Sequence, residues 1–162
     1  IKSNITVNQF DKNLVNNINL KKIVNERKII KKLNSSNTIS FEAKKYSNSL
    51  IRDFFSEFNL VHGRLIFSKN IFISGGNIEC KGESLLISEY PRLNFLCLFN
   101  LKDTKKIIKK FPILKKIKLK PINLNIEGSL NILNNKINFN KINSSEGYEA
   151  NQEDIQYFKR TL

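Results

Sequence analysis

The largest concentration of charge in the sequence is a basic stretch at residues 102–120, KDTKKIIKKFPILKKIKLK, with nine lysines and one aspartate. Such a stretch can form a solvated face, meet an anionic lipid surface, or contact nucleic acid. Nucleic-acid-binding segments usually add aromatic rings or arginines, whereas Phe111 is the only aromatic residue here and arginine is absent. Nucleic acid is therefore the least favoured partner. The candidates for contact with an anionic surface are Lys105, Lys106, Lys109, Lys110, Lys115 and Lys116.

The sequence offers few side chains for catalysis or metal binding. His62 is the only histidine, and it precedes Gly63 in an expected turn with no paired Cys, His or carboxylate motif. No serine lies in a G-x-S-x-G motif, and neither glycine-rich phosphate-binding motif occurs. We therefore predict a protein that is not an enzyme and that takes no metal and no cofactor.

The two cysteines, Cys80 and Cys97, each lie within an apolar stretch and are 17 residues apart. Neither has the neighbours of a catalytic thiol. They are expected either to be buried as small hydrophobic residues or, in an oxidising compartment, to form a single disulfide. The sequence leaves both possibilities open.

Composition limits the class of protein. The chain has 162 residues, enough for one domain or a piece of a larger one, and at 40% hydrophobic residues it is too apolar for wholesale disorder. Its formal net charge is +14, although an Asn- and Lys-rich composition is also typical of AT-rich genomes. No apolar run is long enough to cross a bilayer, and the first residue, Ile1, suggests a processed chain or a fragment.

Alternating apolar residues predict strands from Gly63 onward. Tight turns are expected at Lys69–Asn70 and Gly75–Gly76, pairing Ile66 with Ile73 and Ile73 with Ile78. These turns would place Ile66, Ile71, Ile73, Ile78 and Cys80 on one face, and Leu65, Phe67 and Phe72 on the other.

A second hairpin is expected around a turn at Asn134–Asn135, which would pair Ile132 with Ile137 and Leu130 with Phe139. Further strands are predicted by the same alternation at 1–8, 38–42, 92–100 and 121–128.

Helical spacing and capping residues predict helices at 20–33, 47–58 and 103–111, and a last helix near the C-terminus that begins with Glu153 and Asp154. The expected fold class is α+β, with a mainly antiparallel curved β-sheet, a meander of hairpins, and short flanking helices. We expect residues 1–45 to form a poorly defined N-terminal segment that continues from an upstream chain, and residues 46–162 to form the β-rich segment.

Short strand-and-turn phrases recur over roughly residues 55–162. They include FNLVHGRLIFS, NIFISGGNIECKGE, EYPRLNFLCLF, LKDTKKIIKKF, IEGSLNILNNKINFNKI and YEANQEDIQYFKRTL. In these phrases the chain resembles the Lys- and Asn-rich members of the AsmA-like family of Gram-negative envelope proteins. The resemblance implies a periplasmic segment, anchored to the inner membrane by a helix that is not in this chain. It also implies a long β-sheet that curls into an apolar groove for intermembrane phospholipid transport or outer-membrane assembly.

A lipid that crosses water needs a dry lining, because each exposed acyl CH₂ costs ~0.8 kcal/mol. The candidate lining residues are Ile66, Ile71, Ile73, Ile78, Leu130, Ile132, Ile137 and Phe139. The expected partners are phospholipid or a membrane surface and other parts of the same longer chain. Two alternatives remain: a basic nucleic-acid-binding module that uses residues 102–120, and a purely structural scaffold in which the apolar faces pack against the helices at 49–58 and 103–111 or against each other.

Overall fold

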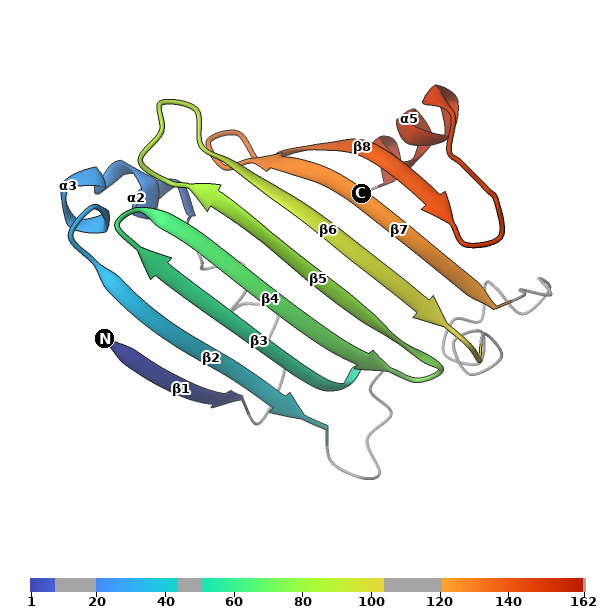
Figure 1. Ribbon diagram of the computed structural model, residues 1–162, viewed down its shortest axis with the longest axis horizontal. Coiled ribbons are helices and arrows are strands. Elements are labelled where there is room, and N and C mark those ends of the chain that lie inside the picture. The colour runs from blue at the N-terminus through green and yellow to red at the C-terminus, as the bar shows by residue number, and fades with distance from the viewer. Residues whose placement is uncertain (8–19, 44–50, 104–120, 162) are drawn as a thin grey trace.

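Backbone hydrogen bonds join strands from both halves of the chain into one eight-stranded sheet (Figure 1). The computed structural model describes residues 1–7, 20–43, 51–103 and 121–161. In chain order the elements are β1 Lys2–Val7, α2 Leu20–Asn25, α3 Arg27–Ile30, β2 Asn34–Glu42, β3 Ile51–Val61, β4 Arg64–Ile73, β5 Gly76–Leu85, β6 Arg92–Leu101, β7 Ile122–Asn131, β8 Lys136–Ser144 and α5 Gln152–Thr161.

The order of strands in the sheet follows the order in the chain, from β1 to β8. Every pair from β2 to β8 is antiparallel, as a meander of hairpins requires, whereas β1 runs parallel to β2 after the chain crosses through α2 and α3. The sheet is therefore mixed and curved, and the fold is mainly β, for which the expected α+β class is a loose description. The expected division after residue 45 falls between β2 and β3, which are hydrogen-bonded neighbours.

The register divides the sheet into two chemically different sides. One side, which we call the apolar face, carries hydrophobic residues on every strand from β3 to β8. Its largest members are Phe54, Phe58, Leu65, Phe67, Ile71, Ile73, Ile78, Leu93, Phe95, Phe99, Leu124, Ile126, Leu130, Ile137, Phe139 and Ile142. The opposite side, the polar face, carries mostly Asn, Ser, Glu and Lys. This separation is what period-two alternation produces when one face of an antiparallel sheet is kept from water.

The expected turn at Lys69–Asn70 is wrong, because β4 continues through it for ten residues. Lys69 pairs with Ser56 on β3 and with Cys80 on β5, so both sides of the strand are hydrogen-bonded at this point. Pairing with two neighbours outweighs the weak local preference of Lys-Asn for a turn. An uninterrupted strand puts Ile66 on the polar face, and moves Leu65 and Phe67 to the apolar face.

Both remaining hairpins differ from the expected register by two residues. The β4–β5 turn lies at Ser74 and Gly75, where Gly75 has a φ of 111°, and Ile71 lies opposite Ile78. The β7–β8 connection spans residues 132–135 and brings Leu130 opposite Ile137. Because side chains alternate with a period of two, a shift of two residues leaves each side chain on its expected face.

The helix expected over 47–58 is wrong where the structure describes it, since Ile51–Val61 is strand β3. Phe54, Phe55 and Phe58 fit helical spacing, yet Phe54, Phe58 and Leu60 also alternate with polar residues, and β2 and β4 supply pairing on both sides. The helix expected at 20–33 forms as the two short helices α2 and α3. The helix expected at 103–111 lies outside the described residues except for Asp103.

The C-terminal helix is confirmed as α5, and its start is capped by a reciprocal pair of hydrogen bonds. The Asp154 backbone N–H donates to Asn151 Oδ1 at 2.9 Å, and the Asn151 N–H donates to Asp154 Oδ2 at 3.1 Å. This exchange satisfies amides that the first helical turn leaves unpaired. Glu153 and Asp154 lie in the first turn, as the helix dipole favours.

The buried core lies at one end of the sheet. There Val24 and Ile30 of the two short helices pack with Leu60 at the end of β3, Leu86 after β5, and Ile132 in the β7–β8 turn. Ile132 retains only 2% of its surface in contact with solvent. The helices α2 and α3 therefore hold this end of the sheet together by covering it.

Two glycines on the apolar face receive the rings of phenylalanines that lie opposite them. A Cβ at Gly82 would lie 2.6 Å from the Phe67 ring, and one at Gly128 would lie 2.6 Å from the Phe95 ring. Gly82 pairs with Phe67 and Gly128 pairs with Phe95, so each ring occupies the space above the glycine on the next strand. The two rings therefore pack directly against the backbone of the neighbouring strand instead of projecting away from the sheet.

Replacing Gly82 with alanine should destabilise the protein by ~1–3 kcal/mol, because the new methyl group overlaps the Phe67 ring and the backbone of β6. Urea unfolding followed by circular dichroism would measure the change in free energy of unfolding. Asn125→Ala, on the exposed side of β7, is the control and should change it by no more than ~0.5 kcal/mol. Equal effects of the two substitutions would contradict this account of the glycine.

Candidate functional site

The apolar face brings together six of the eight residues expected to line a lipid groove. Ile71, Ile73 and Ile78 lie on β4 and β5, and Leu130, Ile137 and Phe139 lie on β7 and β8. The other two lie elsewhere. Ile66 is 45% exposed on the polar face, and Ile132 is buried in the β7–β8 turn as part of the core.

The apolar character of this side is not uniform across the sheet. On β1 and β2 the face is divided: Ile5, Val7, Ile39 and Phe41 continue it at one end of these strands. At the other end it is polar, and the Ser3 hydroxyl donates to Asn37 Oδ1 at 2.7 Å. Asn37 also donates to Ser35 Oγ at 3.2 Å. The longest uninterrupted hydrophobic lining for a ligand is therefore on the β3–β8 part of the face, away from the Ser3, Ser35 and Asn37 end of β1 and β2.

The described helices cover only part of the apolar face. Val24 and Ile30 of α2 and α3 pack on its end near Leu60, and α5 contacts β8. Of the two helices expected to cover it, the one at 49–58 is strand β3, and the one at 103–111 lies almost wholly outside the described residues. Among residues of the face, Ile137 remains 39% exposed on the edge strand β8, and most others are half-buried.

A disulfide joins the two cysteines across β5 and β6. Cys80 and Cys97 lie directly opposite each other on the apolar face, and their sulfur atoms are bonded at 2.10 Å. Of the two possibilities that the sequence left open, the structure has the bridge. Disulfides of this kind persist in oxidising compartments.

One charged side chain lies on the apolar face among the register-paired residues of the described strands. Lys69 is placed there by β4, between Phe67 and Ile71, and its Nζ lies 5.0 Å from the centroid of the Phe54 ring. Burial lowers the Lys69 pKa below its ordinary value of 10.5. The alternation of Phe67, Lys69 and Ile71 already indicates that these residues share a face, but the turn expected at 69–70 hid this pattern.

On the described strands no carboxylate lies beside this charge, and the register explains why. The nearest acidic residues along the neighbouring strands, Glu57 on β3 and Glu79 on β5, project from the polar face. Each has a partner there: Glu57 accepts from the Ser68 hydroxyl at 3.4 Å, and Glu79 accepts from Asn77 at 2.8 Å. Lys69 is therefore a partly desolvated cation whose described side-chain contact is the Phe54 ring and not a carboxylate.

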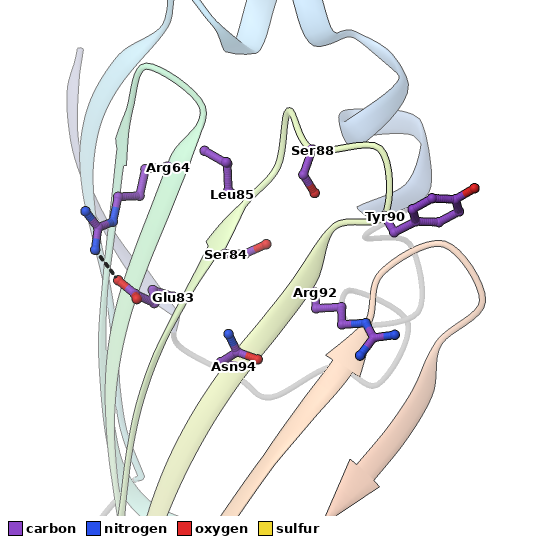
Figure 2. Close-up of a pocket in the computed structure, with 8 residues that line it drawn as sticks. All are labelled: Arg64, Glu83, Ser84, Leu85, Ser88, Tyr90, Arg92 and Asn94. Carbon is purple, nitrogen blue, oxygen red and sulfur yellow. Dashed lines mark hydrogen bonds and ion pairs between the residues drawn. The ribbon is translucent and has the colours of Figure 1, made fainter.

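A pocket of about 420 Å³ opens where β5 and β6 separate, beyond the last backbone pair of Glu83 with Asn94 (Figure 2). Arg64 and Glu83 form an ion pair at 2.6 Å on its β4–β5 side. Tyr90 and Arg92 lie on its β6 side and point away from that pair. The lining residues are Arg64, Glu83, Ser84, Leu85, Ser88, Tyr90, Arg92 and Asn94.

The chemistry available in this pocket is limited. Its two serines have no histidine beside them, and Glu83, the only carboxylate in the lining, is held by Arg64, so a nucleophile with an activating base is not assembled. The Ser84 hydroxyl is buried without a hydrogen-bond partner. Arg92 could hold an anion, but its exposed position in an open depression makes such an attraction weak.

The remaining sequence candidates lie outside this side of the sheet. All six lysines expected to meet an anionic surface lie at positions 105–116, outside the described residues. His62 lies in the β3–β4 turn with a φ of 47°, next to Gly63 at 86°, as expected for a two-residue hairpin loop. In the described ranges no three acidic, Cys or His side chains gather as a metal site, and no helix is long and apolar enough to cross a membrane.

Comparison with known proteins identified no similar protein. No protein-family model, no curated protein and no solved structure matches this chain. The resemblance to the AsmA-like family therefore stays a prediction from the quoted phrases.

Removing the disulfide should lower the free energy of unfolding by ~3 kcal/mol, the chain-entropy value for a loop of about 15 residues. Urea unfolding of the double variant Cys80→Ala/Cys97→Ala and of the wild type, each with and without reductant, would measure this. Reductant should destabilise the wild type and leave the double variant unchanged. A wild type that is insensitive to reductant would contradict the bridge.

Replacing Lys69 with methionine should raise stability at about pH 7. Since burial lowers the Lys69 pKa in the folded state, the unfolded chain binds this proton more tightly, and the charged form opposes folding. This penalty is fully present below the folded-state pKa and is relieved as the pH rises through it toward the unfolded value. Methionine removes the charge and keeps a favourable contact with the Phe54 ring.

Urea midpoints at several pH values would test this. The advantage of Lys69→Met over wild type should shrink as the pH approaches the ordinary lysine pKa of 10.5. Lys81→Met, at an exposed site on the polar face of β5, is the matched control and should shift stability by less than ~0.5 kcal/mol. A lower midpoint for Lys69→Met at about pH 7 would show that the charge is compensated.

Proposed function

We propose that this chain is a non-enzymatic segment that binds the acyl chains of phospholipid along its apolar face. Its place would be the periplasm, in an AsmA-like protein that serves intermembrane phospholipid transport or outer-membrane assembly. The observation that carries the proposal is the apolar face itself. Hydrophobic side chains on six neighbouring strands, β3 to β8, share one side of a curved sheet whose other side is mostly polar.

Hydrophobic burial supplies the affinity in this proposal. An acyl chain that moves from water onto an apolar surface gains ~0.8 kcal/mol for each CH₂ that is buried, and it needs no specific ligand residue to do so. The half-buried residues of the face, and Ile137 at the edge, still have surface to contribute. The low-lying rings over Gly82 and Gly128 favour a flat contact with an extended chain.

The dimensions of the sheet suit one section of a longer path. Eight strands at a spacing of ~4.8 Å span ~34 Å across the sheet, which is comparable to the thickness of one bilayer rather than to the distance between two membranes. Other parts of a longer chain would continue the apolar surface. An anchor in the inner membrane would likewise belong to a segment outside these residues, as the resemblance implies.

The disulfide supports the proposed compartment. A Cys80–Cys97 bridge is typical of extracytoplasmic proteins and rare where thiols are kept reduced. The alternative of nucleic-acid binding depends on residues 102–120, of which the structure describes only Lys102 and Asp103, and no described contact favours it.

Photo-crosslinking provides a test with a matched control. A photoreactive amino acid at Ile137 and, separately, at Ile66 compares two isoleucines of similar exposure, 39% and 45%, on opposite faces. The purified chain would be mixed with phospholipid vesicles, irradiated, and examined by mass spectrometry for lipid adducts. We expect adducts several-fold more abundant at Ile137 than at Ile66.

Lipid extraction of the chain purified without detergent gives an independent measurement. Phospholipid should be recovered with the wild-type protein. Absence of recovered lipid, together with equal or absent adducts at the two isoleucines, would overturn the proposed function and favour a structural scaffold.

A further inference from the structure

Lys69 is a partly buried cation whose described side-chain contact is the Phe54 ring, and the described strands place no anion beside it. Its register neighbours across the sheet are Ser56 on β3 and Cys80 on β5, both uncharged. The acidic side chains on those strands project from the polar face. A cation that is partly removed from water and lacks an anionic partner destabilises the folded state, and such groups are concentrated at functional sites.

We propose that the apolar face binds a long-chain fatty acid, with its carboxylate on the Lys69 ammonium and its alkyl chain extended over the hydrophobic rows toward β8. The inference rests on the proposed function, in that acyl chains bind this face, and adds a ligand class and an anchoring residue to it. The ligand supplies an anion that the described strands do not provide.

The surroundings of Lys69 favour a carboxylate over a larger anionic head group. Ser56 is fully buried and its hydroxyl donates to the Ser68 carbonyl at 3.0 Å, so it is not available to a ligand. No second cation lies on this face among the paired residues of the described strands. One ammonium can satisfy a carboxylate, but it would leave most oxygens of a phosphate with its head group unpaired in an apolar setting.

The direction of the alkyl chain follows from the composition of the face. From Lys69 toward β8, the same cross-strand row continues through the Cys80–Cys97 disulfide to Ile126 and Ile142. These four strand spacings cover ~19 Å without a charged residue. Toward β1 the row meets the buried polar Ser56 on the very next strand before it reaches Ile39 and Ile5, whereas toward β8 every position after Lys69 is apolar.

Calorimetric titration of the folded chain with two ligands of equal length isolates the charge. Dodecanoate and dodecanol share their alkyl chain and differ in the carboxylate. We expect wild-type protein to bind dodecanoate about tenfold more tightly than dodecanol, which is the order of one charge-assisted contact.

Lys69→Met should remove this preference while dodecanol affinity is retained, and Lys69→Arg should keep the preference. The control Lys81→Met, on the neighbouring strand and the polar face, should behave as wild type.

The outcomes separate the two proposals. Equal affinity of wild type for the two ligands, or a preference that survives in Lys69→Met, would overturn the fatty-acid site while dodecanol binding still supports acyl-chain binding. If neither dodecanoate nor dodecanol binds and lipid adducts are absent at Ile137, both proposals fail together. A preference lost equally in Lys69→Met and Lys81→Met would assign the effect to net charge and would also overturn the site.

Discussion

The two-residue period of the side chains along paired strands is the constraint on which this structure depends. Seven strand pairs share one continuous register from β1 to β8, so the side of each residue is set relative to every other strand. A slip of a single residue in any pair would turn a hydrophobic set toward water and a polar set toward the apolar face. The cost of such a slip grows with the number of apolar side chains involved, which explains how a polar-rich chain can hold one defined arrangement.

The same constraint distributes stability unevenly over the molecule. The cluster of buried hydrophobic side chains lies at one end, where Val24, Ile30, Leu60, Leu86 and Ile132 meet. Elsewhere the sheet is held by backbone pairing, by rings lying over Gly82 and Gly128, and by the bridge between β5 and β6. Among the described residues, these contacts on the apolar face are what hold the register of the central strands.

The position of the charged side chains on the two faces of the sheet is more informative than the net charge of the chain. The chain carries a formal charge of +14, yet its described ion pair, Arg64 with Glu83, and the acidic residues of its register-paired strands lie on the polar face. On the apolar face the paired residues include a single cation. Its position is therefore informative in a way that the net charge, which composition alone can produce, is not.

Alternation in the sequence was sufficient to predict the meander order and the side on which Ile71, Ile78 and Leu130 lie. It also predicted the strands at 1–8, 38–42, 92–100 and 121–128. These features could be predicted because a period of two is visible in neighbouring residues. Tertiary structure decided what local patterns could not. It made a strand of residues that fit a helix around Phe54 and Phe58, carried β4 through Lys69–Asn70, placed Ile66 on the polar face, and joined Cys80 to Cys97. In each case the deciding interaction comes from another strand, whose backbone and side chains are close in space but distant in sequence.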